Sequence, residues 1–561
     1  MRRFPFHLLP ILVAAFTACA PARPAGPDGA AQPGAQAQPQ RTLTFIVKVE
    51  PIASTTNIDL SGGVNQAIIG RLFGAGLSQQ DHLDVPRPYL AEALPTLNTD
   101  TWKVAADGTM QTTYRLRPNL SWHDGTPLTV EDFVFAYKVY RDPASNTQFD
   151  TARTREITSI TTPDNRTIVL NWRRPNVDAG QLEGGKGGFA AMPRHVLEEP
   201  FNSDPSKLVG HPYFTTAYVG LGPYKLDRWE PGAFVEGTAF DGHALGKPKI
   251  EHVKVIWNGD SNVALATVLG GNADLAGDDA LRFQQGNLLR KEWGPNKGVV
   301  LYNTTSVRYT QMQFRPELVN PKAMLDLRVR KALAHGIDRQ GFLDALLEGE
   351  GYTADALISR ERDYYSELDK VTAKYPYDIR RAAQYLTEAG LTKGSDGLFA
   401  STSEVFAPEV RGEQQNELVV MVDGWKRAGI NAQVAVTPAS LATDNEYRSF
   451  LPAMAVTKSS LADRTVNSKF ATDTIAAPEN RYGGTNKGGY SNPDYDRLYT
   501  SFNTTLDRGE ANKLTVEIAK FVSEQLPGLP LYYDFQVTAH VAGLKGPLGN
   551  NFWNIQDWTW S

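Results

Sequence analysis

Hydrophobic and polar residues alternate in some parts of the chain, and this pattern predicts strands. Alternation over residues 43–49 and again over 111–116 indicates two strands with one buried face each. The Asp-Gly pairs at 107–108 and 124–125 supply the positive φ that tight turns require. A short helix is predicted over 88–94, where the sequence is PYLAEAL.

Apolar residues at helical spacing, preceded by capping side chains, predict longer helices. Thr129 is a predicted N-cap before an apolar face, and Asp326 and Asp338 are predicted caps of two further helices. Residues 414–427 carry the same pattern and are followed by Gly429, a typical helix terminator. Helices and strands therefore alternate along the chain. The predicted fold class is α/β or mixed α+β, without internal repeats or heptads.

The composition is that of a soluble globular protein large enough for several domains. The 561 residues are 41% hydrophobic and 21% charged, and two or three domains are expected at this length. The 57 basic and 62 acidic residues give a net charge of -5, so no basic field attracts nucleic acid. Nucleic acid is therefore excluded as an expected partner. No cofactor or metal site is expected either, because the nine histidines and single cysteine are scattered.

The start of the chain has the features of an export signal. Arg2 and Arg3 precede an apolar stretch over 4–16, and the sequence FTAC at 16–19 resembles the bacterial lipobox, in which the cysteine becomes lipidated. We expect a lipoprotein signal peptide at 1–18 and lipidation of Cys19. The alternative is an ordinary secretory signal with a chance cysteine. Residues 19–40 are rich in Ala, Pro, Gln and Gly and are expected to form a disordered tether.

Four blocks of sequence resemble the extracellular solute-binding proteins of family 5, which serve oligopeptide and dipeptide transport. The longest block covers residues 89–143. The others are GLGPYKL at 220–226 with WEPG at 229–232, DLRVRKAL at 326–333, and YSNPDYDRL at 490–498. Their order and spacing resemble those of the family from Thr42 to the carboxy terminus.

The resemblance implies a fold of two lobes that close on a ligand, with an extra domain inserted into the first lobe. In this numbering, the expected parts are listed here: lobe I at 41–87, 201–300 and 525–561, the inserted domain at 88–200, and lobe II at 301–524.

The resemblance also implies that the protein binds a solute and catalyses no reaction. The expected role is the substrate-binding component of an ATP-driven (ABC) importer, a monomer that captures peptides outside the cytoplasmic membrane and delivers them to a permease. An oligosaccharide, a nickel chelate or haem is the alternative cargo. A secreted hydrolase is the alternative of another class, but no Gly-x-Ser-x-Gly elbow or His-Glu-x-x-His helix occurs. His195 with Glu198 and Glu199 lacks an evident further metal ligand.

Candidate ligand-binding residues follow from the same resemblance. Peptide-binding relatives hold the ligand's terminal ammonium with an aspartate of lobe II, and Asp463, followed by Arg464, is the acid nearest the expected place. The alternative is a solvated Asp-Arg pair on a loop. Phe73 in lobe I and Tyr309 in lobe II fall where the family presents residues to the cleft, and their alternative is a place in the core.

Overall fold

The structure, a computed structural model, describes most of the chain after residue 40. The described residues are 41–50, 67–82, 85–145, 156–183, 189–399, 406–410, 415–442, 444–549 and 552–561. They belong to one compact unit, Arg41–Ser561. The predicted signal peptide, the tether and Cys19 lie outside the described residues.

A mixed sheet runs through the unit. Ten strands of the described chain form it, in the order β14-β13-β15-β12-β16-β11-β1-β10-β9-β8. Their bounds are β1 Leu43–Val47, β8 Tyr224–Glu230, β9 Phe234–Ala239, β10 His252–Trp257, β11 Leu275–Ala276, β12 Gly298–Met312, β13 Pro408–Val410, β14 Ala435–Val436, β15 Met454–Ser460 and β16 Gly528–Val541.

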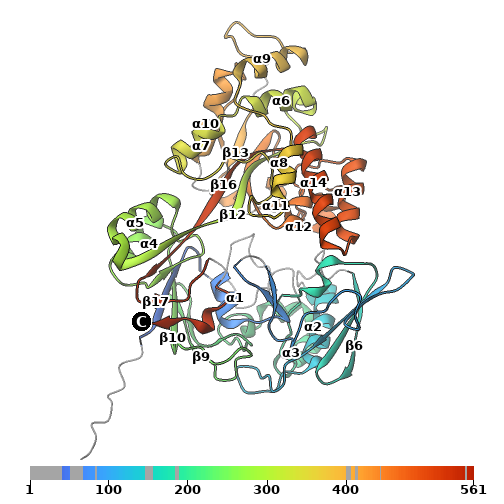
Figure 1. Cartoon of the computed structure of the whole chain (residues 1–561), viewed down its shortest axis with the longest axis vertical. Helices are drawn as coiled ribbons and strands as arrows, with labels where there is room; N and C mark the ends of the chain where they lie inside the picture. The colour runs from blue at the N-terminus through green and yellow to red at the C-terminus, as the bar shows by residue number, and fades with distance from the viewer. Residues whose placement is uncertain are drawn as a thin grey trace, which may run out of the picture. The chain divides into compact units, whose positions relative to one another are not determined.

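Two long antiparallel strands connect the two ends of this sheet. β12 and β16 pair from Gly298 opposite Val541 to Gln311 opposite Gly528, and Figure 1 shows them side by side. At one end, β11 joins β16 to β1, which in turn pairs with β10, and at the other end β15 joins β12 to β13. The strand pair β12–β16 is therefore the physical connection that any motion between the two ends must bend or twist.

A smaller antiparallel sheet forms a separate layer with its own core. Its strands, in the order β4-β5-β7-β6, are β4 Trp102–Val104, β5 Met110–Arg115, β7 Thr167–Trp172 and β6 Ile157–Asp164. Two short pairs complete the strands: β2 Ser78–Gln80 with β3 Pro86–Pro88, and β17 Leu544–Lys545 with β18 Thr559–Trp560. The alternation of buried and exposed side chains along β5 and β7 places one face of the smaller sheet in this core.

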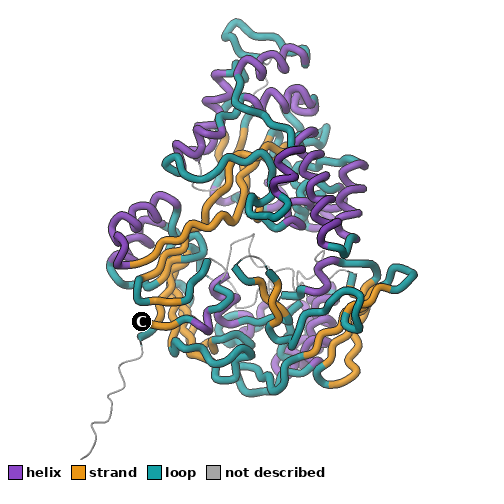
Figure 2. The backbone as a smooth tube through the Cα atoms, viewed as in Figure 1, coloured by secondary structure: helices purple, strands orange, loops and turns teal. Residues whose placement is uncertain are grey.

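Helices flank the strands along the whole described chain, as Figure 2 shows. Their bounds are α1 Ala67–Phe73, α2 Val130–Arg141, α3 Arg194–Ser203, α4 Ser261–Leu269, α5 Phe283–Lys297, α6 Leu327–His335, α7 Arg339–Leu346, α8 Tyr365–Val371, α9 Ile379–Glu388, α10 Gln415–Arg427, α11 Asn445–Ser449, α12 Asp463–Asn467, α13 Pro493–Thr504 and α14 Arg508–Gln525. Within the described ranges, every helix is too short or too polar to cross a membrane.

The buried hydrophobic residues group into clusters that follow these layers. One cluster runs from Leu77 to Leu221 around the smaller sheet. Two clusters surround β1, β8–β11 and the end of β16, and two others surround β12, β15 and helices α6–α14. We use the names inserted domain, lobe I and lobe II for the regions around these three groups. The residue boundaries predicted for them stay a prediction.

Most of the predicted elements are confirmed. The strands predicted at 43–49 and 111–116 are β1 and β5. The Thr129 N–H donates to Asp132 Oδ2 at 2.9 Å at the start of α2, and Asp326 and Asp338 accept N–H bonds at the starts of α6 and α7. Gly429, with φ of 82°, follows α10.

The helix predicted over 88–94 is wrong. The Tyr89 N–H donates to Leu77 O at 3.0 Å, and the Glu92 N–H donates to Arg115 O at 2.8 Å. These bonds to distant segments replace the local bonds that a helix needs. Tertiary pairing has therefore overridden local helix propensity here.

Candidate functional site

The parallel strands of lobe I end together at one edge of the sheet. β1 pairs in parallel with both β10 and β11. The loops after these strands are tied together, because the Asn258 N–H donates to Val47 O at 3.0 Å and the Gly277 N–H donates to Ile46 O at 3.1 Å. In open α/β sheets, ligands bind outside the carboxyl ends of the parallel strands. This edge of the sheet is therefore a candidate ligand-binding site.

Two consecutive carboxylates occupy this edge, Asp278 and Asp279, separated from the end of β11 by Gly277. Both adopt left-handed backbone conformations, with φ of 44° and 62°, a region that aspartate enters more often than most non-glycine residues. Asp278 is 6% exposed and its Oδ2 accepts the Ile68 N–H at 2.9 Å. Burial raises the pKa of Asp278 to about 7, and the charge of Asp279 adds to the rise.

A cation from lobe II reaches this edge. Lys458 lies on β15, and its Nζ is 3.3 Å from Asp279 Oδ2. The lysine side chain is 48% exposed and the aspartate 24% exposed, so water still reaches the pair. A solvated pair of this kind contributes little to stability. The position of this ion pair is what matters, because the pair joins lobe I to lobe II beside the ends of the parallel strands.

A buried charge network fixes the strands behind Lys458. Lys458 on β15 lies opposite Arg308 of β12 in the backbone register of the two strands. Arg308 Nε donates to Glu417 Oε1 at 2.8 Å. The side chains of Arg308 and Glu417 are 3% and 1% exposed, and the Tyr532 hydroxyl of β16 also donates to Glu417. Burial alone lowers the pKa of Arg308, but the adjacent carboxylate outweighs it and the pKa is raised. The network thus joins α10 to both long strands.

Asp463, the predicted ammonium ligand, is already paired inside lobe II. It begins α12, and its Oδ1 accepts a bond from Arg362 Nε at 3.1 Å. Arg362 is also held in place, since its Nη2 donates to Leu461 O at 3.2 Å. Burial and the nearby Asp463 carboxylate raise the pKa of Tyr364. The negative charge of Asp463 is therefore balanced by its own lobe, and its contact with a ligand stays a prediction.

Arg464, the neighbouring candidate, links lobe II to the inserted domain. Its guanidinium forms an ion pair with Asp178, which lies in a 3-10 turn, Val177–Gly180, of the inserted domain. Arg464 Nη1 also donates to Asn503 Oδ1 at 3.1 Å. The arginine and aspartate side chains are 17% and 8% exposed. In this structure Arg464 holds two domains together, and a role in ligand binding stays a prediction.

The two aromatic candidates lie in hydrophobic cores. Phe73 is 1% exposed, at the end of α1 within the lobe I core. Tyr309 is 1% exposed within a lobe II core, edge-on to Phe470 with the ring centroids 6.5 Å apart. These surroundings agree with the alternative interpretation of both residues, a place in the hydrophobic core. Ligand contact through either ring stays an untested prediction.

The histidine considered as a metal ligand has other partners. His195 Nε2 lies 2.7 Å from Asp124 Oδ2, and Glu198 accepts a bond from Arg194 Nε at 2.8 Å. Over the described residues, no group of three or more His, Cys, Asp or Glu side chains is arranged to hold a metal ion.

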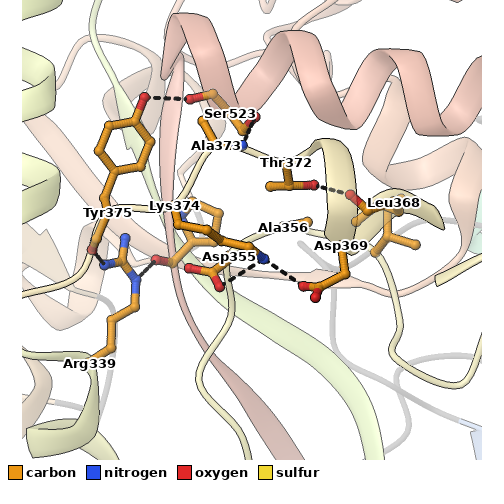
Figure 3. Close-up of polar contacts among 12 residues, drawn as sticks. Arg339, Asp355, Ala356, Leu368, Asp369, Thr372, Ala373, Lys374, Tyr375 and Ser523 are labelled. Carbon is orange, nitrogen blue, oxygen red and sulfur yellow. Dashed lines mark hydrogen bonds and ion pairs between the residues drawn. The ribbon is translucent and has the colours of Figure 1, made fainter. Parts of the chain in front are cut away.

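Sequence reasoning missed a polar network in lobe II, shown in Figure 3. Arg339 donates to Pro530 O of β16 and to Tyr375 O, both at 2.9 Å. Lys374 Nζ lies 3.2 Å from Asp355 Oδ2, and the Tyr375 hydroxyl donates to Ser523 O at 2.9 Å. The network fixes the segment before α9 against α14 and β16. The partners are mostly backbone carbonyls, so the sequence carries no signal for it.

Comparison with known proteins identifies the family. The model of the bacterial extracellular solute-binding proteins, family 5 Middle, matches residues 92–473. The chain therefore belongs to this family of solute-binding proteins. The resemblance noted from the four sequence blocks is confirmed.

The most similar relatives agree with this family. A Brucella ovis protein provisionally named an ABC transporter peptide-binding protein is 26% identical over 287 residues, which are 50% of each chain. The chain thus spans about half the length of the curated relatives that match it first. The structure of NikZ from Campylobacter jejuni with Ni(L-His) has a TM-score of 0.74 at 20% identity and covers 93% of this chain and 100% of that one.

A peptide-bound structure is as similar. The oligopeptide-binding protein of Thermus thermophilus, complexed with a pentapeptide, has a TM-score of 0.74 at 20% identity and covers 92% of this chain and 96% of that one. The predicted fold class, mixed α/β of the two-lobed periplasmic-binding-protein type with an inserted domain, is confirmed.

Proposed function

We propose that the protein is the substrate-binding component of an ABC importer and captures peptides outside the cytoplasmic membrane. The family match over residues 92–473 carries this proposal. The peptide-binding names of the Brucella relative and the Thermus structure support peptide as the cargo. No chemical step is proposed, so a bound peptide leaves the protein unchanged.

The proposed mechanism is closure of the lobes around the ligand. The ion pairs Lys458–Asp279 and Arg464–Asp178 join lobe II to lobe I and to the inserted domain. A ligand that contacts both sides favours the closed form by its differential affinity for that form. The permease then receives mainly loaded protein, because it binds the closed form.

The remaining parts of the proposal concern anchoring and assembly. Lipidation of Cys19 would attach the protein to a membrane of the cell envelope through the tether 19–40. The protein would act as a monomer, since one pair of lobes encloses one ligand.

A nickel chelate is the second candidate cargo, because the NikZ complex resembles this structure as closely as the peptide complex does. The test is thermal unfolding with three separate additions: a pool of short peptides, nickel with histidine, and a pool of oligosaccharides. A ligand at a hundred times its Kd stabilises by about 2.7 kcal/mol. A higher melting temperature with peptides supports the proposal. A rise with nickel-histidine or oligosaccharides and none with peptides rejects peptide as the cargo.

A further inference from the structure

The two long strands that connect the lobes have one stretch in which they are supported least. Among the described residues, β15 pairs with β12 from Ser306 onward, and β11 pairs with β16 at 539–540. Over the stretch between, 301–304 with 535–538, these described strands pair with each other alone. The register also shifts between Thr304 and Ser306, where a β-bulge bends the strand. Rotation of one lobe against the other is therefore easiest at this stretch, which we call the hinge.

Lobe II packs different helices on the two faces of this strand pair. Successive side chains of a strand point to opposite faces. Tyr532 belongs to the core that contains α7 and α10, whereas Tyr533 belongs to the core that contains α12, α13 and α14. We call these two sides the α10 face and the α12 face. Arg464 lies on α12 and pairs with Asp178 of the inserted domain, so this ion pair belongs to the α12 face.

Helix α5 of lobe I lies against the hinge on the α10 face. Phe283, at the start of α5, is 6% exposed and belongs to the lobe II core of α7 and α10. Its ring stacks on Phe535 of β16 with the centroids 5.7 Å apart, and its centroid lies 5.2 Å from that of Tyr302 of β12. Figure 1 shows α5 and α7 on one side of the two strands and α12 to α14 on the other. The α5 contact and the Arg464 contact are therefore on opposite sides of the hinge.

Two ion pairs join α5 to the loop that follows α7 in lobe II, residues 347–351. Arg290 Nη2 lies 3.1 Å from Glu350 Oε1, and Lys291 Nζ lies 3.9 Å from Glu348 Oε2. The four side chains are 47% to 67% exposed, so each pair is weak and is screened by salt. We call these two ion pairs the α5 latch. The latch is strong enough to bias an equilibrium between lobe positions and weak enough to be released.

Contacts on opposite faces of a hinge respond to the same rotation with opposite sign. Leu347, which begins the latch loop, is buried in the core of the α10 face. A rotation that presses lobe II toward the inserted domain on the α12 face moves the latch loop away from α5. The reverse rotation pulls Arg464 away from Asp178. A ligand that draws the α12 face toward the inserted domain must therefore release the latch.

We infer that the α5 latch opposes closure, so that it lowers the affinity for a ligand that it does not touch. This inference rests on the closure mechanism proposed above. A ligand that binds the closed form has an apparent Kd equal to its intrinsic Kd divided by the fraction of closed protein. Loss of the latch raises this fraction and therefore raises the affinity.

The test measures the separation of lobe II from the inserted domain in the protein without ligand. Cys19 is the only cysteine of the chain, so a Cys19→Ser background allows labelling at two chosen sites. Spin labels at Asp100→Cys in the inserted domain and Asp494→Cys on α13 report this separation by pulsed electron paramagnetic resonance. These two aspartate side chains are 99% and 67% exposed, so labels fit without disturbing a core.

The same variants are titrated calorimetrically with the pool peptide that raises the wild-type melting temperature most. The control reverses the charge of two exposed acids that pair with cations of their own lobe. A fourfold variant restores both latch pairs with reversed polarity. The combinations are Glu348→Lys/Glu350→Lys for the latch, the same two with Arg290→Glu/Lys291→Glu for the restored pairs, and Asp369→Lys/Asp423→Lys for the control. Melting temperatures verify that every variant is folded.

Glu348→Lys/Glu350→Lys should shift the label distances to shorter values and tighten peptide binding by roughly threefold to tenfold at low salt. In about 1 M salt its difference from the wild type should disappear, because the charges are screened. The fourfold variant should return to the wild-type distances and affinity, and the control should not depart from them. Asp178→Asn, which breaks the contact on the α12 face, should shift the distances to longer values.

Unchanged or longer label distances in Glu348→Lys/Glu350→Lys would overturn the inference. An equal shift in the control, or no recovery in the fourfold variant, would overturn it as well. If peptides bind but the latch variant changes neither the distances nor the affinity, the latch fails and the proposed function survives. If the label distances respond as expected and none of the peptides binds, peptide as the cargo fails and the latch stands.

Discussion

The guanidinium of Arg464 in lobe II forms an ion pair with the carboxylate of Asp178 in the inserted domain, and water reaches little of either side chain. Breaking one partner of a largely buried pair leaves the other charge uncompensated. Separation of these two domains therefore leaves each of the two charges without its partner. The pair is a point at which opening and stability are coupled.

Replacement of Arg464 by Ala should lower the free energy of unfolding by about 2 to 4 kcal/mol, since Asp178 is left buried without its cation. Urea unfolding measures the loss. Asp178→Asn and the double variant complete a thermodynamic cycle that isolates the pair. Strictly additive losses would show that the two side chains do not interact.

The network behind Lys458 gives a second stability prediction. Glu417→Gln removes the carboxylate that is hydrogen-bonded to the Arg308 guanidinium, 3% exposed, and should cost about 3 to 5 kcal/mol. The matched control is Glu510→Gln, because Glu510 pairs with Lys513 on the surface, where ion pairs contribute about 0 to 1 kcal/mol. Equal effects of the two substitutions in urea unfolding would contradict the structural role of the network.

The buried Asp278 predicts a pH-dependent stability. Its pKa is raised from 3.8 to about 7, so the folded state holds a proton that the unfolded state has already lost between these values. The stability contributed by this protonation is full below about pH 4 and is lost as the pH rises through 7. The neighbouring charges are Asp279 and, against it, Lys458.

Asp278→Asn removes this titration. The variant should therefore gain more over the wild type at pH 8 than at pH 5, by roughly 1 to 3 kcal/mol. Melting temperatures at the two pH values measure the difference. A gain that is the same at both pH values would show that Asp278 does not titrate with a raised pKa in the folded protein.

Cys19 gives a prediction outside the described residues. If it is the lipidated cysteine, Cys19→Ser should abolish incorporation of labelled fatty acid and release the protein from the membrane fraction. Ala20→Ser, which leaves the cysteine in place, is the control. Labelling of the Cys19→Ser protein would refute lipidation at this residue.

Local sequence signals predicted much of the fold. The cap residues Thr129, Asp326 and Asp338 marked helix starts because their side-chain and backbone bonds are local. The helix expected at 88–94 failed because the bonds of Tyr89 and Glu92 go to segments that are adjacent only in the folded chain. Local propensity contains no information about such partners.

The site was less predictable than the fold. Asp463 and Arg464 were chosen by resemblance, but their partners Arg362 and Asp178 lie 101 and 286 residues away in sequence. Asp278 was not predicted as a site residue, because no strand was predicted before it. Its burial and its orphaned oxygen depend on the folded backbone around Ile68, which pattern reasoning does not supply.

The central claim is that the protein binds a peptide and leaves it chemically unchanged. Isothermal titration of the purified protein with the peptide that stabilises it most, followed by mass spectrometry of the recovered peptide, tests this claim most directly. We predict one peptide bound per chain, an intact recovered peptide, and weaker binding after acetylation of its ammonium group. Cleavage of the peptide, or no binding of any peptide while another solute binds, would contradict the account.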